Sequence, residues 1–137
     1  MLKITQEVID KIVEHGRLEA PLEACGYLAA KNNVVCKHIE MENIDASPVH
    51  YSMEPAQQFA AVRSCRKEGL TIIAVYHSHP ETAAFPSAED IKLAYDPSLS
   101  YVIVSLAESN PSIHSFIIKK DNVYQEQIEI IVSSENA

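Results

Sequence analysis

Residues 70–80, LTIIAVYHSHP, carry the strongest structural signal in the chain. The first part, residues 70–76, is apolar, rich in β-branched side chains and about as long as a strand, which is typical of a strand buried on both faces. This strand delivers His77-Ser78-His79-Pro80 at its carboxyl end. Because side chains alternate along a strand, His77 and His79 point to one side and Ser78 to the other. Two imidazoles can therefore converge on one ion.

Helices are predicted both before and after this strand in the sequence. Apolar residues at helical spacing predict a first helix over about 5–17, which Thr5 can cap. A second helix begins at Pro55 and ends before Gly69. A short third helix is expected over about 86–95. The core face of the second helix is expected to contain Phe59, Val62 and Cys65.

The remaining pattern predicts further strands. Two apolar stretches flank Asn32-Asn33, a pair that tolerates the positive φ of a tight turn, and so predict a hairpin. Closely spaced strands with short turns must be mostly antiparallel, whereas a strand flanked by helices favours a parallel neighbour. The expected fold class is α/β, a mixed, mostly antiparallel sheet flanked by helices. The expected strands are 25–30, 34–41, an extended piece at 50–53, 101–106, 113–118 and a last one ending near 132.

Composition excludes several classes of protein. The 137 residues, 47% of them hydrophobic, are enough for one core, and we expect a single domain over 1–137. A net charge of -8 disfavours nucleic acid as a partner. No apolar stretch approaches the ~18 residues of a membrane span, and the beginning does not resemble a signal peptide, so a cytoplasmic protein is expected. The three cysteines show no C-x-x-C pair and are expected to be buried thiols.

Asp90 follows in the first turn of the predicted third helix, where its carboxylate could join His77 and His79 around one ion. Three protein ligands leave a fourth tetrahedral position for water, as in a catalytic zinc site. Cleavage of a peptide bond also needs a proton for the departing nitrogen, and hence a second carboxylate. Ser87 and Asp90 have a structural explanation as well, because a serine followed three residues later by an acid resembles a capping box.

The segment from His77 to Asp90 resembles the JAMM (MPN+) metalloprotease motif H-[ST]-H-P-x(6)-S-x(2)-D, with every defining position filled. Residues 21–28, PLEACGYL, are similar to the P-x-E-x-C-G-x-L element of that family. The resemblance implies an MPN domain, a cytidine-deaminase-like fold. It also implies zinc held by His77, His79 and Asp90, Glu23 as the proton shuttle, and Ser87 as a donor to the oxyanion.

The resemblance also implies a class of substrate. Family members cleave peptide or isopeptide bonds at the C-terminal tails of ubiquitin-like proteins. Only ten residues separate His79 from Asp90, which leaves no room for the long insertions of eukaryotic members. The small prokaryotic type is therefore expected, acting on a β-grasp sulfur carrier that ends in Gly-Gly. Release of cysteine from a carrier adduct and trimming of a C-terminal extension both remain open.

Three alternatives compete with this hypothesis. A non-catalytic MPN scaffold would typically lack one of the five site residues. A RadC-like, DNA-repair-associated protein shares the H-x-H-P motif, but the acidic charge argues against it. A zinc deaminase has a related sheet layout, but it needs a later C-x-x-C, which the sequence does not contain.

Overall fold

The computed structural model describes residues 1–132, which form three helices and eight strands. The helices are α1 (Gln6–Glu19), α2 (Pro55–Lys67) and α3 (Ala88–Lys92). The strands are β1 (Leu2–Thr5), β2 (Cys25–Lys31), β3 (Val34–Met41), β4 (Thr71–His79), β5 (Ser100–Ser105), β6 (Ser112–Lys119), β7 (Asn122–Glu126) and β8 (Ile128–Ile131).

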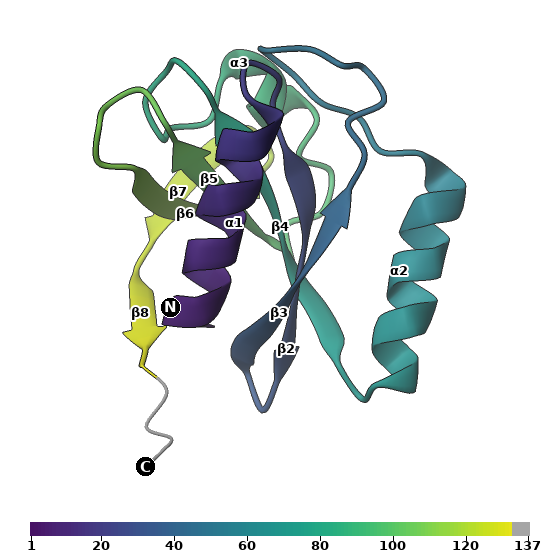
Figure 1. Cartoon of the computed structure of the whole chain (residues 1–137). Helices are drawn as coiled ribbons and strands as arrows, with labels where there is room; N and C mark the ends of the chain where they lie inside the picture. Colours follow the sequence, from purple (N-terminus) through teal and green to yellow (C-terminus); the bar gives the residue numbers. More distant parts are fainter. Residues whose placement is uncertain (133–137) are drawn as a thin grey trace.

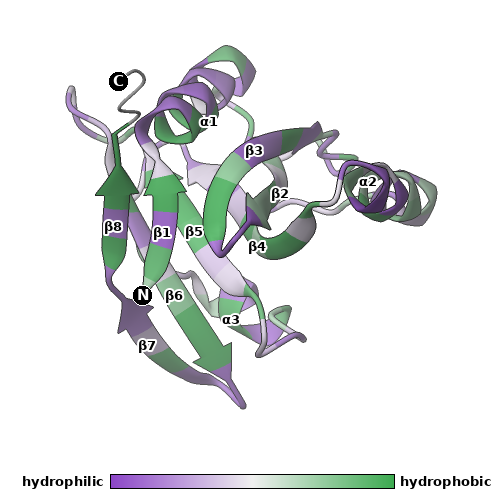
Figure 2. Cartoon of the chain, turned by 90° about the horizontal axis from the view of Figure 1, so that it is seen from below, coloured by the Kyte–Doolittle hydropathy of each residue, from purple (hydrophilic) through white to green (hydrophobic). Residues whose placement is uncertain are grey.

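All eight strands lie in one mixed sheet, in the order β7-β6-β5-β4-β2-β3-β1-β8. The strand with the two histidines, β4, is central: it pairs antiparallel with β2 and parallel with β5. This arrangement confirms the predicted fold class and the parallel neighbour. Only Gln127 separates β7 from β8, the two strands at opposite ends of this order, so the sheet curls strongly (Figure 2).

The two faces of β4 have different surroundings. Ala74 and Tyr76 belong to the main apolar cluster, which they share with Val8 and Ile12 of α1. Alternation along the strand then places His77 on the opposite face. Two smaller clusters cover that second face, one with residues of α2 and the other next to α3. Figure 1 shows α1 and α2 on opposite sides of the strands β2 to β4, and α3 near the carboxyl end of β4.

The first helix and the hairpin agree closely with the prediction. Thr5 caps α1 by accepting a hydrogen bond from the Val8 nitrogen at 3.2 Å. Asn32 and Asn33 form the hairpin turn with φ of 54° and 65°, the left-handed conformation that asparagine tolerates. Gly16 lies within α1 at a point where an added Cβ would approach Ser78 Cβ to 3.2 Å. The helix can thus pack close against β4.

The predicted core face of α2 is wrong in two of its three positions. Phe59 is 70% exposed and Val62 is 38% exposed, and only Cys65 is buried as expected. The helix is anchored through two small buried residues, Ala61 and Cys65. Its contact with the sheet is therefore narrow, and large apolar residues on neighbouring positions remain in solvent.

Other element boundaries also differ from the prediction. Residues 2–5 form β1, a four-residue strand too short to give a clear period. Residues 50–53 are not a strand, and α3 ends at Lys92. The last predicted strand is two strands, because β8 leaves β7 to pair in parallel with β1. Cys36 is exposed, against expectation, since it alternates with the buried Val35 on β3.

Candidate metal centre and active site

Three side chains meet at the carboxyl end of β4. The Nε2 atoms of His77 and His79 are 3.1 Å apart. Asp90, in the first turn of α3, places its Oδ2 atom 3.1 Å from each of these nitrogens. The three ligand atoms thus form an almost equilateral triangle, and this group could hold a metal ion.

The triangle has dimensions that suit a small divalent cation. Ligands ~2.0 Å from a tetrahedral ion are separated by about 3.3 Å, close to the observed spacing. Three such contacts cannot all be hydrogen bonds, because a neutral imidazole carries only one N–H. His79 Nδ1 lies 2.9 Å from the Ala83 carbonyl oxygen, to which it donates, so in the neutral ring Nε2 presents its lone pair. A lone pair facing a carboxylate requires a cation or a proton between them.

The pKa shifts agree with this requirement. Burial by itself would raise the pKa of Asp90, but the two imidazoles and the Ser87 backbone N–H hold it well below its usual range. Burial lowers the pKa of His79, yet the contact with Asp90 outweighs it and leaves this pKa above its ordinary value. The carboxylate is therefore ionised, and a proton on His79 competes with any metal ion.

His77 is enclosed more completely than His79. Burial lowers its pKa, which favours the neutral ring that a metal requires. The ring of Tyr51 lies against the imidazole, with centroids 4.8 Å apart at an angle of 31°. Within residues 1–132, the Nδ1 atom of His77 has no hydrogen-bond partner. Packing against Tyr51, and not a hydrogen bond to Nδ1, thus restrains this ring.

Ser87 and Asp90 form the capping box at the start of α3. The Ser87 hydroxyl oxygen accepts from the Asp90 nitrogen at 3.0 Å, and Asp90 Oδ2 accepts from the Ser87 nitrogen at 2.9 Å. The structural explanation from the sequence is therefore correct, although an aspartate replaces the usual glutamate. Because the hydroxyl oxygen acts as an acceptor in the box, its proton remains available to another acceptor.

Glu23 comes from a distant part of the sequence and lies beside the triangle. Cys25 pairs with His77 in antiparallel register, which places Glu23 at the level of His79. Glu23 is only 2% exposed, and its Oε1 has no hydrogen-bond partner among the described residues. Burial raises the pKa of Glu23 to about 8, although nearby His79 opposes the shift. A carboxyl with such a pKa can both take up and release a proton near neutral pH.

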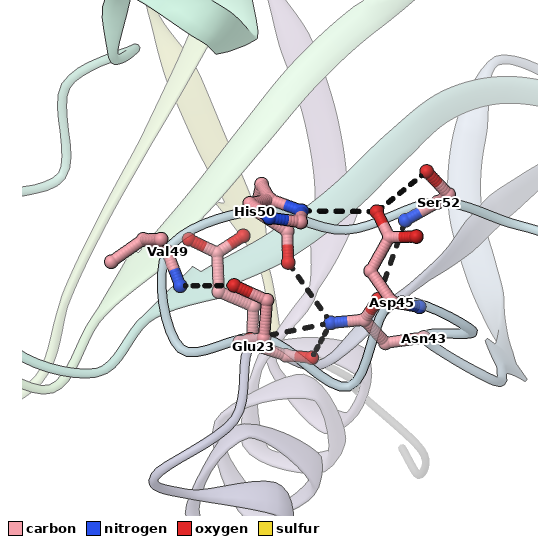
Figure 3. Close-up of polar contacts among 7 residues, drawn as sticks. Glu23, Asn43, Asp45, Val49, His50 and Ser52 are labelled. Carbon is pink, nitrogen blue, oxygen red and sulfur yellow. Dashed lines mark hydrogen bonds and ion pairs between the residues drawn. The ribbon is translucent and has the colours of Figure 1, made fainter.

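Asn43 holds the segment next to Glu23 in place (Figure 3). Its amide nitrogen donates to the carbonyl oxygens of Glu23 and His50, each 3.0 Å away. Its amide oxygen accepts from the backbone nitrogens of Asp45 at 3.1 Å and Ser52 at 3.3 Å. One side chain thereby joins the strand entry that carries Glu23 to the segment that leads to Tyr51.

Sequence reasoning did not predict these supporting contacts. Asn43 lies in a stretch rich in loop-forming residues, and nothing in the pattern distinguishes it from its neighbours. His50, which no motif singles out, lies in the wall of a cavity next to His77. His15 is buried, and its Nδ1 is 2.7 Å from the Tyr76 hydroxyl oxygen. These contacts join segments that are distant in the sequence, so no local motif indicates them.

Comparison with known families identifies the family of this chain. The family model described as prokaryotic homologs of the JAB domain matches residues 5–119. The chain belongs to this family. It is a hydrolase of the JAMM type, in agreement with relatives that are named as a peptidase and a desampylase, which disfavours the non-catalytic scaffold. None of the helices within residues 1–132 is long and apolar enough to cross a membrane.

Individual JAB-domain relatives extend over most of the chain. The CysO-cysteine peptidase of Mycobacterium tuberculosis is 31% identical over 134 residues, which cover 96% of this chain and 92% of that protein. The desampylase of Haloferax volcanii is 32% identical over 112 residues, covering 76% of this chain and 80% of that enzyme. A solution structure of a protein from Desulfitobacterium hafniense has 42% identity and a TM-score of 0.90, covering 99% of this chain and 97% of that one. A JAB1/MPN domain protein from Archaeoglobus fulgidus, at 18% identity and a TM-score of 0.64, shares the fold, with 95% of this chain and 97% of that chain covered.

Proposed function

We propose that this chain is a zinc metallopeptidase that hydrolyses the bond after the C-terminal Gly-Gly of a ubiquitin-like sulfur carrier. The observation that carries the proposal is the convergence of two imidazoles and one carboxylate on a triangle of 3.1 Å edges, with a second, buried acid, Glu23, beside it. Nitrogen and oxygen donors in this number suit zinc and leave one position open. His77, His79 and Asp90 would hold the ion.

Zinc, when bound, would polarise the scissile carbonyl and make a water more acidic. Glu23 takes one proton from the attacking water as its oxygen bonds to the carbonyl carbon. Glu23 then gives that proton to the nitrogen as the carbon–nitrogen bond breaks. The products are a carrier that ends in a free Gly-Gly carboxylate and an amine. Over one turnover Glu23 returns to its starting state, so one water is consumed for each bond cleaved.

Ser87 contributes a hydrogen bond to the developing oxyanion. Its oxygen is engaged by the Asp90 backbone N–H, which fixes the hydroxyl at the start of α3. The Ser87 hydroxyl can then donate its own hydrogen bond to the substrate oxygen. Donors of this kind are worth ~10²-fold or more in rate in other hydrolases.

The substrate class is inferred from the relatives. Their names refer to a CysO-cysteine adduct, to TtuB-protein conjugates and to desampylation. These substrates support a ubiquitin-like carrier as the partner of this chain, in place of nucleic acid or a membrane. The cytoplasm remains the proposed location. Cysteine, a C-terminal extension and a protein amine all remain candidate leaving groups.

The test is cleavage of a defined carrier followed by mass spectrometry. The purified protein is incubated with a Gly-Gly carrier that bears a C-terminal extension. We expect a product that ends in Gly-Gly, loss of cleavage after chelation, and recovery with stoichiometric zinc. His77→Ala should bind no zinc at the site and should not recover. Full cleavage by the chelated protein, or a cut at another bond, would refute the proposal.

A further inference from the structure

A cavity of about 370 Å³ opens next to the metal triad, on the face of the sheet opposite α1. His77 and Asp90 belong to its lining, so it is continuous with the site. Residues of β4 and β5 belong to its lining, including Val75 and Tyr101. The function proposed above assigns no role to this space.

The cavity and Glu23 lie at opposite ends of the triad along β4. Glu23 is at the level of His79 through the pairing of Cys25 with His77. Val75, in the cavity lining, precedes His77 by two residues and shares its face of the strand. Neither Glu23 nor His79 contributes to the lining.

The placement of Glu23 and the cavity at opposite ends of the triad orients the substrate, on the assumption that the proposed hydrolysis is correct. Glu23 must reach the departing nitrogen, so the leaving group lies at the Glu23 end of the site. The acyl part, which is the carrier tail, must then extend the other way, toward the cavity. The two sides of the scissile bond thus have different surroundings.

The length of the tail decides which residue reaches the cavity. An extended chain advances ~6.6 Å in two residues, the same step that separates Val75 from His77. When the last glycine is at the triad, the residue before the diglycine is level with Val75. Two glycines have no side chains to fill a space of about 370 Å³. The preceding side chain is therefore the one that can occupy it.

The lining defines the chemistry of that side chain. Aromatic and aliphatic residues predominate, among them Tyr51, Met53 and Leu93. The charged lining residues are acidic, Glu89, Asp90 and Asp96, and no lysine or arginine contributes. Burying a carboxylate here would leave it without a counter-ion. An apolar side chain would gain from burial.

We propose that this cavity is the specificity pocket for an apolar side chain at the position immediately before the diglycine of the carrier. It selects substrates by the acyl side of the scissile bond, independently of the leaving group. One enzyme could then process several leaving groups from the same carrier. This inference depends on the orientation that Glu23 imposes, and its test separates it from the proposed hydrolysis.

Binding tests the pocket without requiring turnover. Peptides ending in X-Gly-Gly, with X as leucine, glycine, lysine or aspartate, are titrated by calorimetry into the zinc-loaded protein. We expect leucine to bind at least tenfold more tightly than glycine, and aspartate to bind weakest. Equal affinity for all four peptides, or tightest binding of aspartate or lysine, would overturn the pocket assignment. The same series as extended carriers reports cleavage separately, so a failure of hydrolysis leaves the binding order interpretable.

A charge placed in the pocket provides the matched comparison. Gln58 lines the cavity and bonds to the Tyr27 hydroxyl at 2.8 Å, whereas its neighbour Gln57 is exposed and outside the lining. Gln58→Lys should raise the affinity for the aspartate peptide at least threefold. Gln57→Lys carries the same charge change on the same helix and should leave the preference as in the wild type. An equal effect of both variants would show general charge attraction and overturn the pocket.

Discussion

Glu23 is the residue on which the proposed chemistry depends most. The raised pKa, about 8, means that its buried environment favours the neutral carboxyl. Glu23→Gln therefore substitutes a neutral isostere that the fold accepts. We expect zinc content and melting temperature to be retained while kcat falls by ~10²–10⁴-fold. Mass spectrometry of the product and metal analysis of the same sample check this prediction. Cleavage at the wild-type rate would remove Glu23 from the proton path.

The sequence predicted the positions of the triad residues and of Glu23 to different extents. His77 and His79 follow from the alternation of one strand, and Asp90 from a short helix soon after it. Glu23 is separated from them by two strands and a helix. Only the family resemblance singled it out, because its place beside His79 depends on the pairing of β2 with β4. Tyr51 gave no signal, since it lies in an irregular segment and contacts His77 only in the folded chain.

The segment between β3 and α2 is an element without regular structure that Asn43 organises. Asn43→Ala removes hydrogen bonds to backbone groups of Glu23, His50, Asp45 and Ser52. We expect a loss of ~2 kcal/mol in the free energy of unfolding, because buried backbone groups lose their partners. Turnover should fall about tenfold or more at unchanged zinc content, since the metal ligands lie on β4 and α3.

The control for Asn43 lies in the same segment. The Asp45 carboxylate accepts hydrogen bonds from the His50 ring and the Ser52 hydroxyl, and neither bond involves Glu23. Asp45→Asn should therefore leave kcat within about twofold of wild type, as expected for an exposed pair. Chemical denaturation and steady-state kinetics measure both variants. If Asn43→Ala and Asp45→Asn are equally active, Asn43 does not position Glu23.

Helix and strand types were predictable where the local pattern was regular. The hairpin at Asn32-Asn33 and the helix after Thr5 both carry strong turn and capping signals. The exposed side of α2 was not predictable, because its large apolar residues Phe59 and Val62 point away from a narrow contact. The break at Gln127 also depends on a distant partner, since β8 pairs with β1 at the other end of the chain.

Metal binding should stabilise the whole molecule. The ligands come from β4 and α3 and meet only in the folded chain, so zinc binds the native state preferentially. At a free zinc concentration a hundredfold above Kd, mass action contributes about 2.7 kcal/mol. This should raise Tm by roughly 10 °C. Magnesium, which prefers oxygen ligands, should have little effect.

The stabilisation by zinc should depend on pH in a definite direction. The pKa of His79 lies above its ordinary value, so a proton occupies the ring as pH falls and must leave before zinc binds. The zinc-induced rise in Tm should therefore be smaller at pH 5.5 than at pH 7.5. In the metal-free protein the pH dependence of stability has the opposite sign, because the protonated His79–Asp90 pair stabilises the fold at low pH. That contribution is lost as pH rises through the raised pKa. A rise independent of pH would contradict this coupling.

Anomalous diffraction at the zinc absorption edge, on crystals of the zinc-loaded protein, tests the metal centre most directly. A peak ~2.0–2.2 Å from His77 Nε2, His79 Nε2 and Asp90 Oδ2 is the predicted result, with Glu23 beside the open position. A fully occupied zinc bound elsewhere, with these three atoms unliganded, would contradict the account.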